Sequence, residues 1–171
     1  MADNHEDTGG PDEAAVQLAY MAELMNKGSP QASSLGFHTL EISPGRALVR
    51  VKYREDLIGD PATGVIAGGV VTTLLDHTCG QAVYAGLKKA VAIATLDLRI
   101  DYMRRSEPGL DVFVAANVYK WTHSIAFVRA IAYDRDPQDP VAAAQAAFML
   151  DASAGRPPGA NLKPPARGSA A

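Results

Sequence analysis

One carboxylate interrupts an apolar stretch in the middle of the chain. Between Pro61 and Leu87 the only fully charged side chain is Asp76, in the segment GGVVTTLLDHTCGQAVYAG. An unpaired carboxylate in apolar surroundings costs several kcal/mol or takes up a proton. Asp76 therefore either lies on a solvated surface or does chemistry, and a carboxylate can act as a general base or as a nucleophile.

The residues around Asp76 predict a long helix with two different faces. A helical repeat places six residues in one apolar stripe and directs Asp76 away from it. The residues one turn from Asp76 are Thr72, Thr73 and Gly80, whereas a solvated face usually carries Lys, Glu or Gln. An ordinary solvent-facing aspartate is one interpretation, and a site that another chain or a ligand approaches closely is the other. The stripe consists of Val70, Val71, Leu74, Leu75, Thr78 and Ala82.

Two glycines, Gly68 and Gly69, open this predicted helix. The first backbone N–H groups of a helix have no partner within it and lie at the positive end of its dipole. Because glycine allows close approach, these N–H groups could bind an anion or a developing oxyanion. Glycine also starts many helices for purely conformational reasons, so the pair alone does not define a site.

The remaining periodicities predict the elements that would position these residues. Residues 13–27 have helical spacing and stop at Gly28-Ser29-Pro30. The runs LGFHTLEIS and RALVRVKYR flank Pro44-Gly45 as a hairpin, and residues 55–67 are predicted to form a loop. After the long helix come four strand-like runs, predicted as a meander, although the alanine-rich last run could also be helical. Those runs are 91–104, 110–120, 124–134 and 141–151. The result is an α+β fold, with one antiparallel sheet wrapped around a long central helix.

Composition limits the class of protein. The chain has 171 residues and a net charge of −3, which gives no electrostatic footprint for nucleic acid or an anionic membrane. No apolar run reaches the length of a membrane span, and the acidic N-terminus is unlike a secretion signal. The single cysteine, Cys79, cannot form an internal disulfide. We expect a cytoplasmic protein with disordered tails at 1–12 and 152–171 around one domain at 13–151.

The order of motifs resembles the PaaI-type hotdog-fold acyl-CoA thioesterases over roughly residues 35–150. The resemblance rests on a loop followed by two glycines, an apolar helix with an acid seven residues after the second glycine, and the strand TLDLRIDYMR. It implies a hotdog fold and hydrolysis of an acyl-CoA to a free acid and coenzyme A. In such enzymes the helix acid activates water or attacks the thioester, which is the role implied for Asp76. The resemblance also implies that the Gly68 N–H polarises the carbonyl and that Thr95 assists the acid.

Two positions depart from the family pattern. The family usually has His before the two glycines, where this chain has Ala67, and often has Asn in the preceding loop, where GDPATG has none. A non-catalytic acyl-CoA-binding protein with the same fold is therefore the alternative function. A hotdog hydratase is a further alternative, but its D-x-N-P-x-H motif is not found. Beside the acid and the oxyanion donor, we expect substrate contacts from Ala67, Gly69, Thr72 and Thr73.

Other reactive side chains are interpreted as follows. His77 points about 100° away from Asp76 around a helix, which predicts a surface or subunit-contact histidine. Cys79 lies beside the apolar stripe, as a small core residue does. The histidines lack metal-ligand spacing, so we expect no metal and no cofactor, coenzyme A being part of the substrate. For its phosphates the first candidates are Arg104 and Arg105, ahead of Lys88, Lys89 and Lys120.

Helix geometry also predicts the assembly. Gly68 and Asp76 are separated by about 12 Å along one helix, at about 1.5 Å per residue. A reacting carbonyl must lie roughly 3 Å from both its oxyanion donor and the group that delivers the nucleophile. One chain cannot supply both, whereas two helices that run antiparallel across a two-fold axis can. We therefore expect a homodimer with shared sites, alone or paired into a homotetramer.

Overall fold

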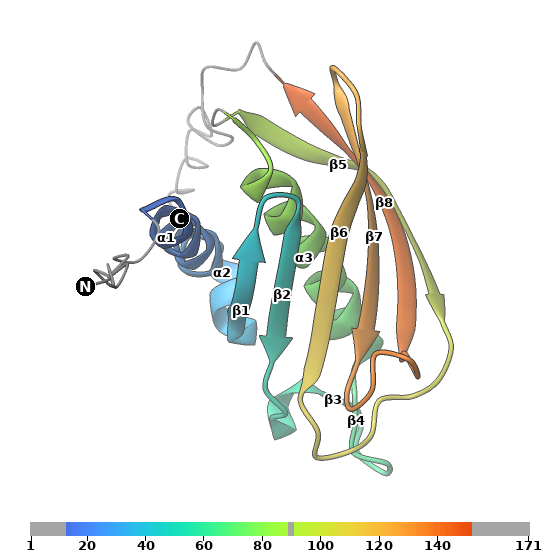
Figure 1. The fold of residues 1–171 in the computed structure, drawn as a ribbon. Coiled ribbons are helices and arrows are strands. Elements are labelled where there is room, and N and C mark those ends of the chain that lie inside the picture. Colours follow the sequence, from blue (N-terminus) through green and yellow to red (C-terminus); the bar gives the residue numbers. More distant parts are fainter. Residues whose placement is uncertain (1–12, 89–90, 152–171) are drawn as a thin grey trace, which may run out of the picture.

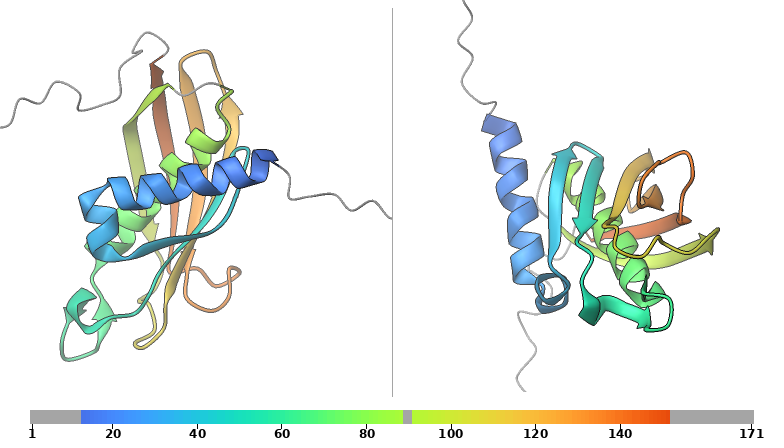
Figure 2. Two further views of the ribbon diagram at one scale, coloured as in Figure 1. Left: turned by 90° about the vertical axis from the view of Figure 1, so that its left-hand side faces the viewer. Right: turned by 90° about the horizontal axis from the view of Figure 1, so that it is seen from below.

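The computed structural model describes residues 13–88 and 91–151. The tails predicted at 1–12 and 152–171 lie outside the described residues. The described part contains a six-stranded antiparallel sheet that curves around a long helix, with a further helix outside the sheet (Figures 1 and 2). This confirms the predicted α+β class and the central position of the helix.

In the part of the chain that the structure describes, two helices precede the sheet. Helix α1 (Glu13–Gly28) follows the predicted range, and it lies alongside β1 in both views of Figure 2. Helix α2 (Pro30–Leu35) was not predicted, because Gly28-Ser29-Pro30 was interpreted only as a stop. Ser29 is in fact the N-cap of α2, with its hydroxyl accepting from the Ala32 N–H at 3.3 Å, and Pro30 occupies the first helical turn.

The first hairpin forms as predicted. Strand β1 (Phe37–Ser43) pairs with β2 (Arg46–Val51), and Gly45 between them has a φ of 76°, which glycine adopts without strain. The predicted loop at 55–67 contains more structure than expected. It holds a 3₁₀ turn, η1 (Glu55–Leu57), and a small hairpin of β3 (Ile58–Asp60) and β4 (Val65–Ile66).

The four later strands are all present, and the alanine-rich run is a strand. They are β5 (Ala92–Tyr102), β6 (Val112–Trp121), β7 (Ile125–Tyr133) and β8 (Ala142–Asp151). The sheet order is β1-β2-β6-β7-β8-β5, so the predicted four-strand meander is wrong. Only β6, β7 and β8 follow one another, whereas β5 crosses the molecule and pairs with β8 at the edge. Alternation within a strand predicts which face is buried but not which strand is the neighbour.

Helix α3 (Gly68–Ala85) fills the concave side of the sheet. All six residues of the predicted apolar stripe are buried, and they pack with inward residues of β2, β6, β7 and β8 such as Val49, Val114, Val128 and Phe148. Cys79 is fully buried in the same core, as expected. Along the described ranges, no helix combines the length and the apolar character that a membrane crossing needs.

Candidate active site

Asp76 and Thr95 meet on the side of α3 that faces β5. The Thr95 hydroxyl donates a hydrogen bond to Oδ1 of Asp76 at 2.9 Å. Asp76 is half-buried, and Thr95 is exposed. The carboxylate therefore has an orienting partner and remains accessible from solvent, which is the environment that a general base or a nucleophile needs.

A β-bulge places Thr95 on this face. Simple alternation along β5 would put Thr95 on the side of Asp97, Arg99 and Asp101. In the structure the register of β5 against β8 shifts between Thr95 and Asp97, so that Leu96 is the extra residue. Thr95 is opposite the buried Phe148 and shares the inward face with Tyr102, whereas Asp97 and Arg99 point outward.

The start of α3 has no side-chain cap. Ala67 occupies the N-cap position with no side-chain hydrogen bond, and Gly68 and Gly69 are exposed. Ala67 is held by its backbone, because its N–H donates to Leu57 O at 2.9 Å and its carbonyl accepts from Val70 N–H at 2.9 Å. The glycine N–H groups lie in the first turn, where no carbonyl of the helix reaches them, so they can receive an anion.

Residue 59 must be small for this arrangement. A Cβ built on Gly59 would lie 2.7 Å from Cα of Ala67, which is closer than side chains tolerate. The hairpin of β3 and β4 therefore passes directly against the residue before the two glycines. This close approach fixes where the α3 N-terminus begins.

The hydroxyls of Thr72 and Thr73 bond within the protein. Thr73 donates to Gly69 O at 2.8 Å, and Thr72 lies 2.9 Å from the hydroxyl of Tyr102. Tyr102 in turn donates to Gly68 O at 2.7 Å. Both threonines lie beside the predicted oxyanion site, but the Thr73 hydroxyl bonds a carbonyl of the first helical turn and the Thr72 hydroxyl bonds Tyr102 of β5. Tyr102 is the residue that sequence reasoning missed; its place at the inward end of β5 was the available signal.

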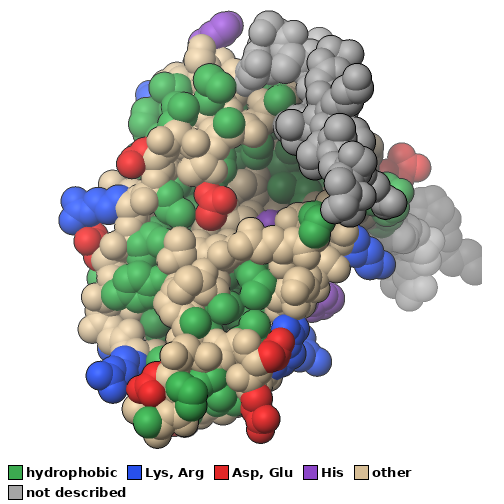
Figure 3. Space-filling model, turned by 180° about the vertical axis from the view of Figure 1, so that it is seen from behind, with side chains coloured by type: hydrophobic (Ala, Val, Ile, Leu, Met, Phe, Trp, Pro, Cys, Tyr) green, Lys and Arg blue, Asp and Glu red, His purple; other side chains and the backbone are tan. Residues whose placement is uncertain are grey.

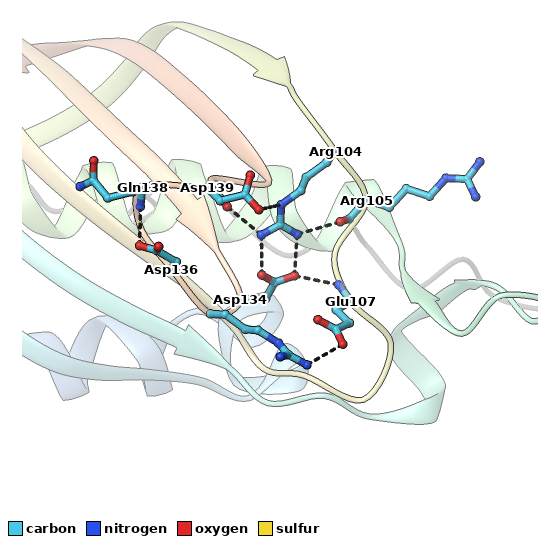
Figure 4. A network of polar contacts seen from close by, with 8 residues as sticks. Arg104, Arg105, Glu107, Asp134, Asp136, Gln138 and Asp139 are labelled. Atoms are coloured by element: carbon cyan, nitrogen blue, oxygen red, sulfur yellow. Dashed lines mark hydrogen bonds and ion pairs between the residues drawn. The ribbon is translucent and has the colours of Figure 1, made fainter.

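Arg104 and Arg105 differ in their surroundings (Figure 4). The guanidinium of Arg104 donates to both carboxylate oxygens of Asp134, at 2.6 and 2.9 Å, and pairs with Asp139 at 3.0 Å. The hydrogen bonds to Asp134 raise the pKa of Arg104. In turn, Arg104 and the N–H of Glu107 lower the pKa of Asp134 to about 2, although burial acts in the opposite direction. Arg104 thus ties the end of β5 to the β7–β8 loop. Arg105 is exposed and extends away from these carboxylates.

His77 is half-buried in this chain and bonds within it, rather than lying on an open surface, and a subunit contact at His77 stays a prediction. Its Nε2 is 2.7 Å from Oδ1 of Asn26 and 3.1 Å from Nε2 of Gln81, and its ring lies 5.4 Å from that of Phe37. Burial lowers the pKa of His77, and the charge of Asp76 opposes this change. His77 therefore belongs to a polar cluster, completed by Thr39, that joins α1 and β1 to α3.

The Cys79 thiol is not a candidate nucleophile at neutral pH. Burial, and to a smaller extent the charge of Asp76, raises the pKa of the Cys79 thiol to about 12, so that it is not a thiolate at neutral pH. Within 13–88 and 91–151, no group of three or more His, Cys, Asp and Glu residues could hold a metal ion.

Comparison with known proteins gives matches across this region. A family model described as the thioesterase superfamily matches residues 63–141. An esterase of Halobacterium salinarum is 39% identical over 75 residues, which are 42% of this chain and 50% of that protein. The chain thus spans about half the length of that relative. Human acyl-coenzyme A thioesterase 13 is 28% identical over 111 residues, or 64% of this chain and 77% of the human protein.

Solved structures share the fold. A Pseudomonas aeruginosa protein is 36% identical, with a TM-score of 0.71, over 77% of this chain and 98% of its own. The PaaI protein from the phenylacetic acid degradation operon of E. coli shares the fold at 17% identity, with a TM-score of 0.70, over 80% of this chain and 96% of its own. The family match includes the helix with Gly68 and Asp76 and the strand with Thr95, so across these elements the chain is similar to the thioesterase superfamily.

Proposed function

We propose that this protein hydrolyses acyl-CoA thioesters to free acid and coenzyme A. The observation that carries the proposal is the 2.9 Å hydrogen bond from Thr95 to Asp76, on an accessible side of a helix with no other Asp, Glu, Lys or Arg. Acyl-coenzyme A thioesterase 13 supports the substrate class by its name and its 28% identity.

Asp76 acts as the general base or as the nucleophile. As a base, it takes a proton from water while the water oxygen bonds to the thioester carbonyl carbon. The carbonyl oxygen gains negative charge and is stabilised by the Gly68 N–H at the positive end of α3. The carbon–sulfur bond then breaks, and the coenzyme A thiolate leaves and takes up a proton. Thr95 holds the carboxylate in the orientation that this proton transfer requires.

We propose that each site is shared between two chains, because Gly68 and Asp76 lie about 12 Å apart along one helix. Strand β5 supports a partner at this position, since it is an edge of the sheet and exposes Leu96 (53%), and Met103 just after its end is 59% exposed. The other edge, β1, is covered by α1. On the face opposite that of Figure 1, most charged side chains lie toward the margins (Figure 3). A second copy related by a two-fold axis fits such a face.

The substrate is proposed to lie along the first turn of α3. Ala67 and Gly69 line the thioester end, beside Thr72 and Thr73. We assign the coenzyme A phosphates to Arg105, because the guanidinium of Arg104 is already paired with Asp134. A free thiol at Cys79 fits a reducing compartment, so we place the reaction in the cytoplasm.

The test is thiol release from a panel of acyl-CoAs that includes short, long and aryl acyl groups. The wild-type protein is expected to release coenzyme A from at least one of them, and Asp76→Asn to lower kcat by about 10²–10⁴-fold. Asp97→Asn is the matched control, because this carboxylate points outward from β5. Full activity of Asp76→Asn, or an equal loss in Asp97→Asn, would refute the assignment of Asp76.

A non-catalytic acyl-CoA-binding protein is the second candidate function. The observation in its favour is Ala67, which offers a substrate no polar side chain at the N-cap of α3. Saturable binding of an acyl-CoA by the wild type, with no release above that of Asp76→Asn across the panel, would establish this function instead.

A further inference from the structure

The first turn of α3 needs support that its own residues do not supply. It begins with two glycines, which have the largest backbone freedom to lose, and its N-cap residue, Ala67, makes no side-chain hydrogen bond. An oxyanion donor is effective only when it is already fixed in place before the reaction. Some other group must therefore hold Gly68 if its N–H is to act as the donor.

Tyr102 makes the contact that does this. Its hydroxyl has one proton, and Gly68 O can only accept, so at 2.7 Å Tyr102 is the donor. At 2.9 Å the Thr72 hydroxyl must then donate to the Tyr102 oxygen. The result is a directed chain from Thr72 through Tyr102 to Gly68, in which each hydrogen bond polarises the next. We call this chain the Tyr102 bridge.

The bridge starts from a rigid part of the sheet. Tyr102 is opposite Ala142 in the ladder between β5 and β8, and the next residue, Met103, donates its N–H to Val141 O at 2.9 Å. One residue further, Arg104 is paired with the almost fully buried carboxylate of Asp134. The strand end that carries Tyr102 is thus fixed on both sides, although 51% of the Tyr102 residue is exposed.

We propose that Tyr102 is a positioning residue for the oxyanion donor, an inference that rests on the thioesterase function proposed above. Ala67 is fixed from one side by its hydrogen bond to Leu57 O. The Tyr102 bridge fixes Gly68 from the other side by holding its carbonyl. The Gly68 N–H lies between these two points, so its direction is set before substrate arrives. Removal of the bridge lowers the rate of the chemical step and leaves ground-state binding nearly unchanged.

The test compares Tyr102→Phe with Tyr119→Phe, using a preferred acyl-CoA from the panel. Tyr119 is a control because it is also an exposed tyrosine on a strand, and its ring contacts Phe127 and Arg129. Tyr102→Phe is expected to lower kcat about fivefold with KM within about twofold, the effect of one lost hydrogen bond. Thr72→Val, which keeps the bond from Tyr102 to Gly68, is expected to lower kcat by only about twofold.

Amide hydrogen exchange provides a readout that is independent of activity. In an α-helix the amide of Thr72 donates to Gly68 O, so its exchange reports opening of the first turn. We expect about fivefold faster exchange at Thr72 in Tyr102→Phe and no change in Tyr119→Phe. Unchanged kcat and exchange in Tyr102→Phe, or a KM increase that accounts for the whole loss, would overturn the proposal. If the wild type hydrolyses no thioester, the proposed function fails, and unchanged exchange would still refute the bridge separately.

Discussion

The ion pair between Arg104 and Asp134 predicts a measurable dependence of stability on pH. The pKa of Asp134 is lowered from 3.8 to about 2, first by the hydrogen bonds from Arg104. A pKa that is lower in the folded state makes the fold more stable above the unfolded pKa, and this stability is lost as pH falls through the folded pKa. The difference corresponds to about 2.5 kcal/mol. We take about 2 kcal/mol, because Arg104 is 29% exposed and water screens part of the interaction.

The assay is urea unfolding of the wild type and of Asp134→Asn between pH 7 and pH 2. At pH 7 the variant should be less stable by about 2 kcal/mol or more, since it also leaves Arg104 without its main partner. The difference should shrink between about pH 4 and pH 2, where the wild-type carboxylate takes up its proton. Asp139→Asn is the control, because Asp139 contacts the same guanidinium but is 74% exposed; it should cost less than about 1 kcal/mol. A stability difference for Asp134→Asn that stays constant down to pH 2 would refute this reasoning.

Three further predictions concern single residues near α3. Thr95→Ala should lower kcat about tenfold with little change in KM, because the carboxylate of Asp76 loses its orienting donor. Steady-state kinetics test this prediction. An unchanged kcat would make Thr95 a purely structural strand residue. Ala67→His, which restores the family residue, should keep or raise activity, since Ala67 is half-exposed and its backbone contacts remain. A large loss in kcat/KM would show that the loop before α3 accommodates only a small side chain at this position. Cys79, with a pKa of about 12 and no exposed surface, should react with a thiol reagent at pH 8 only after denaturation; rapid labelling of the native protein would contradict its burial.

The long-range pattern of the fold could be predicted from sequence because it depends on periodicity. The stripe on α3 and the alternation in the later strands both reflect burial on one side. The neighbour of β5 could not be predicted, because an edge strand and a central strand can carry similar alternation. Helix α2 was not predicted, because Ser29 and Pro30 are typical both of the end of one helix and of the start of the next.

The candidate site, like the fold, could be predicted from sequence only in part. Asp76 could be found from the sequence, because it is the only charged residue in a long uncharged stretch. The pair Gly68-Gly69 could be found because it directly precedes the helical pattern. The bulge at Leu96, which directs Thr95 toward Asp76, has no sequence signal of its own. The pairing of Arg104 with Asp134 was equally hidden, because 30 residues separate them and only the sheet topology brings them together.

The most direct test of a site shared between two chains is complementation between two inactive variants. One is Asp76→Ala. The other is Gly68→Pro, which removes the donor N–H at a first-turn position that accepts proline, after a residue with φ −57° and ψ 133°. A heterodimer of these chains has one intact site of two, made from Gly68 of one chain and Asp76 of the other.

Equal amounts of the two variants are mixed, subunit exchange is verified by mass, and thiol release from an acyl-CoA is measured. Random exchange makes about half of the dimers heterodimers, so a shared site predicts recovery of about a quarter of wild-type activity. A mixture that stays inactive after verified exchange, or a wild-type monomer that is fully active, would contradict the shared site.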